Sequence, residues 1–445
     1  YFRPHKLKII IVTIAIFMMA GLGALLPIII AQSLNTDAGQ SAYPIGLVLM
    51  VFVIGVATWG LAAIRRYLAA QVIADVVMTM RDDAFDAAMR QDLSFFDEFS
   101  TGRIVSRITS DTQEFGEVIM IATDVINQLA VAFILVFVLL AIDVRLTLAV
   151  LAMTPLVAFV ALAFRRMARD VTRQSSRALA EVKKAIQEAV SGIRVAKNYR
   201  QEDAIYNEFL QVNMQSYRIN IRRAFVLANI FPTLNALAGL GTATLVYFGG
   251  RSAVAGLISI SAWYLFVTTV DRFWFPVTNL SAFWSQFQAG LAATERVFGL
   301  IDVESSVSQK GAIPVISLRG EIVFDDVSFR YSSQEQVLNE FRLHIRPGES
   351  IALVGHTGAG KSSIIKLVAR FYEFQEGTIT VDGIDIRDLE LIAYRGKLGV
   401  VSQVPFLFAG TVADNIRYAC PEATDEQIET MARRIGNGEW LETLP

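Results

Sequence analysis

The chain has 445 residues, of which 53% are hydrophobic and 18% are charged, and its formal net charge is −2. This composition is too apolar for an ordinary soluble domain, so we start from the hypothesis of a membrane protein. The near-neutral charge gives no indication of a nucleic-acid partner. The lone Cys420 excludes an intrachain disulfide and a cysteine zinc site, and the three histidines give no sign of a histidine metal site.

Six apolar runs occupy most of the chain before residue 288, and each is long enough for a membrane-spanning helix of roughly 17 to 25 residues. The runs are residues 7–31, 43–64, 125–142, 146–164, 224–248 and 252–287. Basic residues precede the first run, as in a signal peptide, but this run is too long and no convincing small-residue cleavage site follows it. We therefore expect six transmembrane helices in a lipid bilayer.

The connections between these runs differ in length and charge. Residues 65–124 and 165–223 are long and contain many arginines and lysines, whereas residues 33–42 contain neither. Residues 143–145 and 249–251 are expected to be tight hairpins. Because basic loops stay in the cytoplasm, we expect the N-terminus, both long loops and the chain after the sixth run to be cytoplasmic, in a bacterial inner or plasma membrane.

Both long loops are expected to be helical. In the second loop, apolar residues recur every three or four positions, with basic and polar residues on the opposite side. These apolar residues are Ala180, Val182, Ile186, Ala189, Val190 and Ile193. The pattern indicates that the membrane helices continue into the cytoplasm as paired rods, which could transmit movement.

The sixth run contains two adjacent ionisable residues, Asp271 and Arg272. Charges inside a membrane run are costly and usually face a cavity or a partner. They could contact the cargo, or they could pair with neighbouring helices in a purely structural role. Adjacent residues do not face each other on a helix, so the two are not expected to pair together.

The last third of the chain has the composition of a separate α/β domain. A polar linker, residues 302–317, joins an expected membrane domain, residues 1–301, to an expected cytoplasmic domain, residues 318–445. Residues 321–331 alternate polar and apolar side chains, as a half-buried strand does. The candidate core residues of this strand are Ile322, Phe324, Val327 and Phe329.

The most specific motif is a phosphate-binding loop between an apolar run suited to a buried strand, residues 350–354, and a helical pattern, residues 363–374. The loop consists of Gly355, His356, Thr357, Gly358, Ala359, Gly360, Lys361 and Ser362. Its glycines allow backbone N–H groups to converge on phosphate oxygens, and the helix N-terminus adds partial positive charge. We expect Lys361 to bind the β and γ phosphates and Ser362 to bind Mg²⁺. A glycine-rich turn with an exposed lysine is the alternative, but the flanking segments favour a nucleotide site.

Further motifs, taken in chain order, resemble one family: the ATP-binding cassette (ABC) exporters that carry their membrane and nucleotide-binding domains in one polypeptide. The resemblance covers essentially the whole chain. It is carried by Phe95-Phe96-Asp97 and Thr101-Gly102 in the first long loop, Gly192-Ile193-Arg194-Val195 in the second, Ala292-Ala293-Thr294-Glu295-Arg296 after the sixth run, and Val381-Asp382-Gly383 and Gly410-Thr411-Val412 in the α/β part.

This resemblance implies a half-transporter with an all-α membrane domain and an α/β nucleotide-binding domain. It would dimerise with an identical or different half-transporter and use ATP and Mg²⁺ to export a small molecule, lipid or peptide. In the family, Tyr331 would stack on adenine, and Gln403, at the end of an expected strand over residues 398–403, would contact Mg²⁺ and the attacking water. The implied catalytic residues are Lys361 and Gln403, and Ser363 joins the nucleotide-binding set.

Other functions use the same phosphate loop. A non-hydrolysing subunit of a heterodimer and an ATP-gated channel would bind nucleotide without pumping. A membrane-anchored kinase would need an acceptor pocket, and it does not explain the long helical loops. The exporter explains both features.

The chain departs from the family pattern after Gln403. Up to Pro445 it contains no Leu-Ser-Gly-Gly-Gln-type signature, no apolar strand ending in Asp-Glu and no later switch histidine. We expect a fragment of a longer protein, with a degenerate subunit as the alternative. ATPase activity is therefore expected of the full-length protein.

Overall fold

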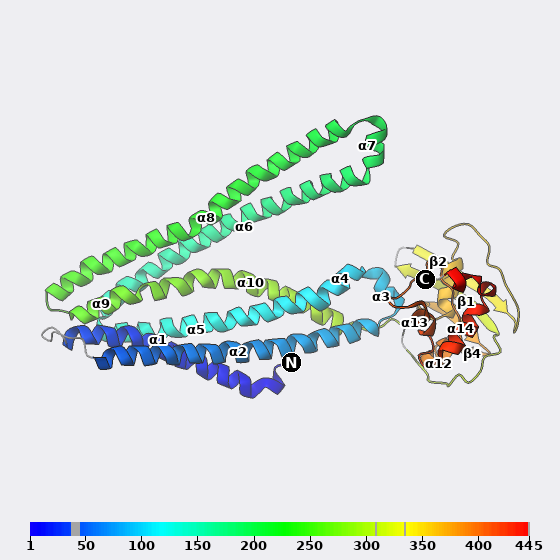
Figure 1. The fold of residues 1–445 in the computed structure, drawn as a ribbon, viewed down its shortest axis with the longest axis horizontal. Helices are drawn as coiled ribbons and strands as arrows, with labels where there is room; N and C mark the ends of the chain where they lie inside the picture. Colours follow the sequence, from blue (N-terminus) through cyan, green and yellow to red (C-terminus); the bar gives the residue numbers. More distant parts are fainter. Residues whose placement is uncertain (37–44, 308, 333–334, 444–445) are drawn as a thin grey trace. The chain divides into compact units, whose positions relative to one another are not determined.

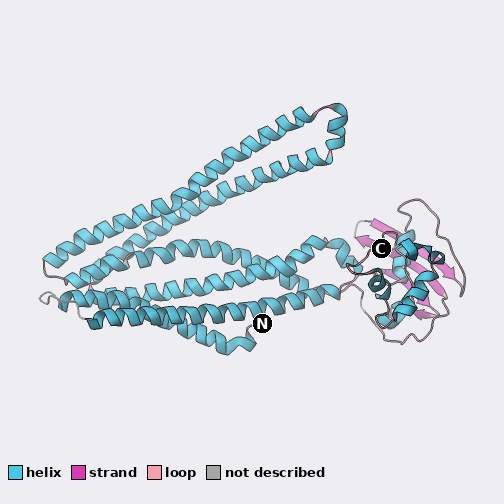
Figure 2. Cartoon of the chain, viewed as in Figure 1, coloured by secondary structure: helices cyan, strands magenta, loops and turns pink. Residues whose placement is uncertain are grey.

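The computed structural model describes residues 1–36, 45–307, 309–332 and 335–443, with the backbone alone for residues 34–36, 271–282, 332 and 335. Two compact units make up the chain. Tyr1–Gln91 and Phe95–Ser305 form the first, and Asp92–Ser94 and Ser306–Pro445 form the second. The first unit is helical and the second contains the β-strands (Figure 2). The predicted fold class, a helical membrane-type domain followed by an α/β region, is confirmed.

The helical unit is built from a few very long helices. α6 and α8 form a hairpin closed by α7, while α10 packs along α5 and α1 packs along α2 (Figure 1). α8 contains 53 residues, which at 1.5 Å per residue is about 80 Å, far more than the roughly 30 Å of a bilayer core. The prediction that the long loops are helical rods is confirmed. The elements are η1 Arg3–His5, α1 Lys6–Thr36, α2 Ile45–Met89, α3 Leu93–Glu98, α4 Thr101–Ser106, the π-helix η2 Arg107–Asp111, α5 Thr112–Ile142, α6 Val144–Ser191, α7 Ile193–Tyr199, α8 Glu202–Val254, α9 Ile260–Thr269 and α10 Asp271–Ile301.

Five helical stretches among the described residues are long and apolar enough to cross a membrane; four of them contain the first, third, fourth and fifth predicted runs, and α2 contains residues 45–64 of the second. The sixth run covers α9, a shorter apolar helix, and the beginning of α10. The side chains of Asp271 and Arg272 lie outside the described residues. Whether they contact cargo or have a structural role therefore stays a prediction.

One of the two predicted hairpins is correct. Asp143 caps α6, and its Oδ1 accepts a hydrogen bond of 2.8 Å from the Leu146 backbone N–H. The hairpin predicted at residues 249–251 is wrong, because α8 continues to Val254. Gly249 instead gives α9 room to pack, since a Cβ there would lie 2.8 Å from Cδ1 of Trp263.

Two glycines bring α5 very close to its neighbours. A Cβ built at Gly116 would lie 2.9 Å from Cγ2 of Ile73 on α2. A Cβ at Gly290 on α10 would lie 2.4 Å from Cγ2 of Val118. Real Cβ atoms do not approach other carbons this closely, so both helix contacts depend on the missing side chain.

Ion pairs join α10 to η2 and α2 to α5. Arg296 on α10 donates from Nε and Nη2 to the two carboxylate oxygens of Asp111 in η2, at 2.8 and 2.7 Å. The buried Arg65 on α2 donates from Nη2 to Asp124 Oδ1 on α5 at 2.7 Å. The Asp111 pair is bidentate, which is the strongest geometry for arginine and carboxylate.

The second unit contains a four-stranded antiparallel sheet with strand order β2-β1-β3-β4. Three of the four predicted core residues of β1, Phe324, Val327 and Phe329, are buried and pack in one apolar core; Ile322 packs against it while partly exposed. The elements are β1 Ile322–Ser332, β2 Glu335–Ile345, α11 Lys361–Val368, β3 Glu376–Val381, β4 Ile384–Asp385, α12 Leu391–Arg395, α13 Val412–Arg417, α14 Asp425–Arg433 and η3 Gly436–Thr443.

A two-residue turn, Asp382-Gly383, joins β3 to β4. Both residues have left-handed backbone angles, with φ of 51° and 82°, as such tight hairpins require. The Asp382 carboxylate accepts backbone N–H bonds from Arg319, Gly320 and Glu321. Burial alone raises the pKa of Asp382, but these hydrogen bonds outweigh it and lower the pKa below the ordinary value.

Three expected elements differ in the structure. Residues 350–354 and 398–403 are not strands. An apolar segment becomes a strand only when a neighbouring backbone pairs with it, and none of the described residues pairs with either segment. The helix predicted over residues 363–374 ends early, at Val368, because Arg370 takes a left-handed φ of 53°.

Candidate nucleotide site

The phosphate loop runs directly into α11. Gly360, with φ of 80°, is the N-cap of this helix, and a Cβ there would lie 3.1 Å from Cδ2 of Leu338 on β2. Gly358 has φ of 88°, which is also strained for other residues. Residues 355–359 are exposed. In the first turn of α11 the Ser363 N–H donates to the Gly360 carbonyl at 3.0 Å, and the partial positive charge of this helix end can bind an anion.

The Lys361 side chain folds back onto the phosphate loop. Its Nζ donates to the backbone carbonyls of Gly355 and His356, at 2.9 and 2.8 Å. The ammonium therefore lies beside the exposed loop backbone. Neighbouring Ser362 is exposed at the start of the helix, so its hydroxyl is accessible to a ligand.

Tyr331, near the end of β1, reaches α11. Its hydroxyl forms a 2.8 Å hydrogen bond with Oγ of the buried Ser363. Its ring meets the rings of Phe329 and Tyr372 edge-on, with centroids 4.8 and 5.0 Å apart and interplanar angles of 77° and 88°. The structure thus brings Tyr331 and Ser363 together at the helix that follows the phosphate loop.

These residues fit a magnesium nucleotide. The loop supplies exposed amides and an ammonium group for phosphates, Ser362 supplies a hydroxyl oxygen of the kind Mg²⁺ prefers, and the partly exposed Tyr331 ring can contact a base. Among the described residues, no cluster of three or more His, Cys, Asp or Glu side chains could hold a metal by itself.

Gln403 is not brought to this group in the structure. It is exposed, and within the described ranges it makes no hydrogen bond to the loop or to α11. The strand expected to carry it is also not formed. Its catalytic role therefore stays a prediction from the family resemblance.

A charged cluster that no sequence motif indicates lies just after the end of α11. Arg370 is only 1% exposed, and its Nη2 lies 3.7 Å from Oε2 of Glu373. Arg387 donates from Nε to Oε1 of the same Glu373 at 2.6 Å. Burial lowers the pKa of the Arg370 guanidinium and raises the pKa of the neighbouring Tyr394 to about 12. No motif or periodicity in the chain indicates this cluster, because its members come from separate turns.

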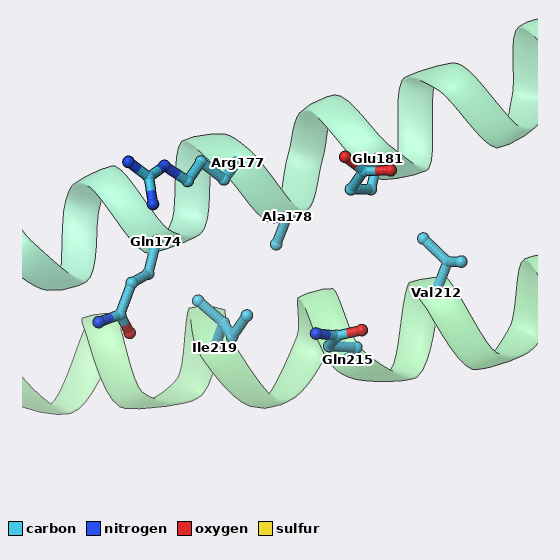
Figure 3. A pocket seen from close by; sticks show the side chains of 7 residues that line it. All are labelled: Gln174, Arg177, Ala178, Glu181, Val212, Gln215 and Ile219. Carbon is cyan, nitrogen blue, oxygen red and sulfur yellow. The ribbon is translucent and has the colours of Figure 1, made fainter.

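A groove lies between α6 and α8 in the helical unit. Its volume is about 220 Å³, and Figure 3 shows the side chains of both helices that line it. Its lining residues are Gln174, Arg177, Ala178, Glu181, Val212, Gln215 and Ile219. All of them lie outside the predicted membrane runs, 146–164 and 224–248, so this groove belongs to the rods.

Comparison with known families matches both units. The family described as the ABC transporter transmembrane region matches residues 7–274, and the family described as ABC transporter matches residues 338–445. The second match implies ATP binding.

Individual relatives cover the chain to different extents. The ABC transporter ATP-binding protein YknV of Bacillus subtilis is 28% identical over 100% of this chain and 74% of its own length. An ATP-dependent lipid A-core flippase of Syntrophus aciditrophicus is 27% identical over 100% of this chain and 74% of its own length. A multidrug efflux ATP-binding/permease protein of Mycobacterium bovis is 33% identical over 86% of this chain, but the match spans only 32% of that longer protein.

The two family matches follow one another in the same order as the two structural units, helices first and phosphate loop second. The first match alone covers more than half of the chain. The chain therefore belongs to the ABC transporter family, as a fused exporter half-transporter whose transmembrane region precedes its ATP-binding domain.

Proposed function

We propose that the full-length protein is one half of a dimeric exporter that uses ATP to move a small molecule, lipid or peptide across a membrane. One observation carries this proposal: a phosphate loop with exposed amides and a positioned lysine occurs in the same chain as five helices apolar enough to cross a membrane. The proposed domains are residues 1–301 for transport, 302–317 as linker and 318–445 for nucleotide binding.

The proposed nucleotide chemistry assigns one task to each group. The amides of residues 355–360 and the Lys361 ammonium bind the phosphates, and Tyr331 stacks on adenine. Ser362 and Gln403 would hold Mg²⁺, which neutralises charge on the phosphates when bound. Gln403 would also orient the attacking water. Positioning and charge stabilisation, rather than covalent catalysis, would then account for most of the rate enhancement.

Transport would follow from a population shift. ATP that binds a closed pair of nucleotide-binding domains more tightly than a separated pair biases the dimer toward closure, and hydrolysis resets it. The long rods of α2, α6 and α8 are suited to carry such a movement, because each is one continuous helix. Alternating access of the cargo site is the expected result.

The cargo classes and the location are also proposals. The names of the relatives, multidrug efflux protein and lipid A-core flippase, support lipids and drug-like compounds as the first candidates. Asp271 and Arg272 remain candidate cargo contacts. We place the protein in a bacterial inner or plasma membrane, and the charge of the loops supports a cytoplasmic N-terminus and nucleotide-binding domain.

The test uses the full-length protein in proteoliposomes. ATP binding, ATP hydrolysis and movement of a fluorescent lipid or drug are measured for the wild type and for Lys361→Ala. Because hydrogen bonds to charged groups contribute about 1.5–3 kcal/mol, the variant should bind ATP about 10- to 150-fold more weakly. Lys397→Met is the control, because it also removes one lysine charge. Lys397 is exposed, follows the C-terminus of α12 and lies outside the phosphate loop.

Three outcomes separate the candidate functions. Hydrolysis that is stimulated by cargo and lost in Lys361→Ala supports the exporter. ATP binding with no turnover in the full-length protein indicates a non-hydrolysing subunit or a gated channel. Unchanged ATP affinity in a folded Lys361→Ala protein contradicts the assignment of the phosphate loop.

A further inference from the structure

Lys366, in the last turn of α11, occupies an unusual position for a lysine. It is only partly exposed, and its Nζ lies 5.1 Å from the ring centroid of Tyr331 and 5.0 Å from that of Tyr372. Within the described ranges, no carboxylate lies within ion-pair distance of it. The ammonium is therefore balanced by two aromatic rings, which attract a cation through their negative faces.

Several neighbouring side chains restrict the Tyr331 ring. Tyr372 is 3% exposed and forms a buried wall, while Tyr331 is 43% exposed. Phe329 contacts the Tyr331 ring edge-on, and Ser363 holds its hydroxyl. Lys366 adds a cation to this arrangement, so the ring has few ways to move while part of its surface stays accessible.

We propose that Lys366 is a positioning residue for the nucleotide base, acting through Tyr331. This inference rests on the proposed stacking of Tyr331 on adenine. Two aromatic faces repel each other when stacked directly, because both carry negative charge density. A cation near the ring draws that density away and also fixes the ring orientation, so both effects favour a base stacked on Tyr331.

A different effect of the same charge has to be separated from this one. Any lysine near the phosphate loop attracts a polyphosphate, whatever base it carries. That attraction acts equally on ATP and on inorganic triphosphate, which has no base. An effect through Tyr331 acts on ATP alone.

The experiment measures dissociation constants of the full-length protein for ATP and for inorganic triphosphate, without Mg²⁺ so that no hydrolysis occurs. Lys366→Met removes the charge and keeps the length of the side chain, whereas Lys366→Arg keeps a cation. We expect Lys366→Met to weaken ATP binding about two- to fivefold, as for a partly exposed cation–π contact. Lys366→Met should leave the affinity for inorganic triphosphate unchanged. Lys366→Arg should retain the wild-type affinity for ATP, and so should Lys397→Met.

A second comparison tests the route through the ring. In a Tyr331→Ala background, Lys366→Met should have little further effect on ATP affinity, because the partner of the cation is gone. Equal weakening of ATP and triphosphate, or an undiminished effect in that background, would overturn the proposal. If Lys361→Ala weakens ATP binding while Lys366→Met does not, the nucleotide site stands and this inference alone fails.

Discussion

Gly290→Ala tests whether α10 and α5 pack as closely as the structure indicates. The new Cβ would lie 2.4 Å from Cγ2 and 3.1 Å from Cβ of Val118. An ordinary carbon contact is about 3.5–4.0 Å, so the groups must separate by roughly 1.1 to 1.6 Å. Rotating the valine does not clear the contact, because its own Cβ is also close and its side chain is stiff at χ1. The helices must therefore move apart.

Overpacking of this kind costs about 1–3 kcal/mol. A glycine-to-alanine change also favours the helix by about 1 kcal/mol, which partly hides the clash. Gly299 on the same helix is the matched control, since a Cβ there meets nothing within 4 Å. The difference between Gly290→Ala and Gly299→Ala therefore isolates the helix contact.

The assay is thermal unfolding of the detergent-solubilised protein, with all variants heated at one rate. At about 2 °C per kcal/mol for a large domain, Gly290→Ala should unfold about 2–6 °C below Gly299→Ala. Adding Val118→Ala should reduce the penalty without abolishing it, because it deletes the 2.4 Å contact to Cγ2 and leaves the 3.1 Å contact to Cβ. A Gly290→Ala protein that unfolds at or above the temperature of Gly299→Ala would refute the close approach of α10 to α5.

Three further predictions concern ionisable and aromatic groups. Folding lowers the pKa of the Asp382 carboxylate, so the stability that it contributes is present above about pH 4 and is lost as the pH falls through the folded pKa. In urea unfolding, the stability of Asp382→Asn should therefore fall less with acid than that of the wild type. Asp111→Asn should cost about 1–3 kcal/mol in thermal unfolding, less than the 3–5 of a fully buried pair, because Arg296 is 45% exposed. Tyr331→Ala should weaken ATP binding by the about 1–3 kcal/mol of base stacking, and Tyr331→Phe should retain most of it despite losing the bond to Ser363.

Each of these predictions has a clear contrary result. Equal acid sensitivity of the wild type and the asparagine variant would show that Asp382 is not held as a charged turn residue. An Asp111→Asn protein as stable as the wild type would show that its pair with Arg296 contributes nothing. A tyrosine-to-alanine variant with unchanged ATP affinity would exclude stacking on Tyr331.

Several features could be predicted from the sequence because they depend on neighbouring residues. Apolar runs longer than a bilayer is thick predict membrane helices whatever lies beside them, and five were found among the described residues. The helical loops and the helix that follows the phosphate loop are equally local, since each follows from periodicity or from glycine. Family membership could be read from the order of such motifs.

Contacts between distant residues depend on the tertiary structure. Residues 350–354 read as a strand, but a strand requires a paired neighbour, and the described residues supply none. Gly249 and Gly250 suggested a turn, yet Gly249 faces Trp263 within a continuous helix. In both cases the local pattern allowed two outcomes, and packing selected one.

The same distinction applies to the candidate site. The phosphate loop could be recognised from its consecutive residues, because these residues carry the chemistry of phosphate binding. Only the tertiary structure placed Tyr331 against Ser363 and Lys366 against two tyrosine rings. These partners lie on separate elements, and their contacts depend on how the sheet and α11 pack around a shared apolar core, which no local sequence pattern encodes.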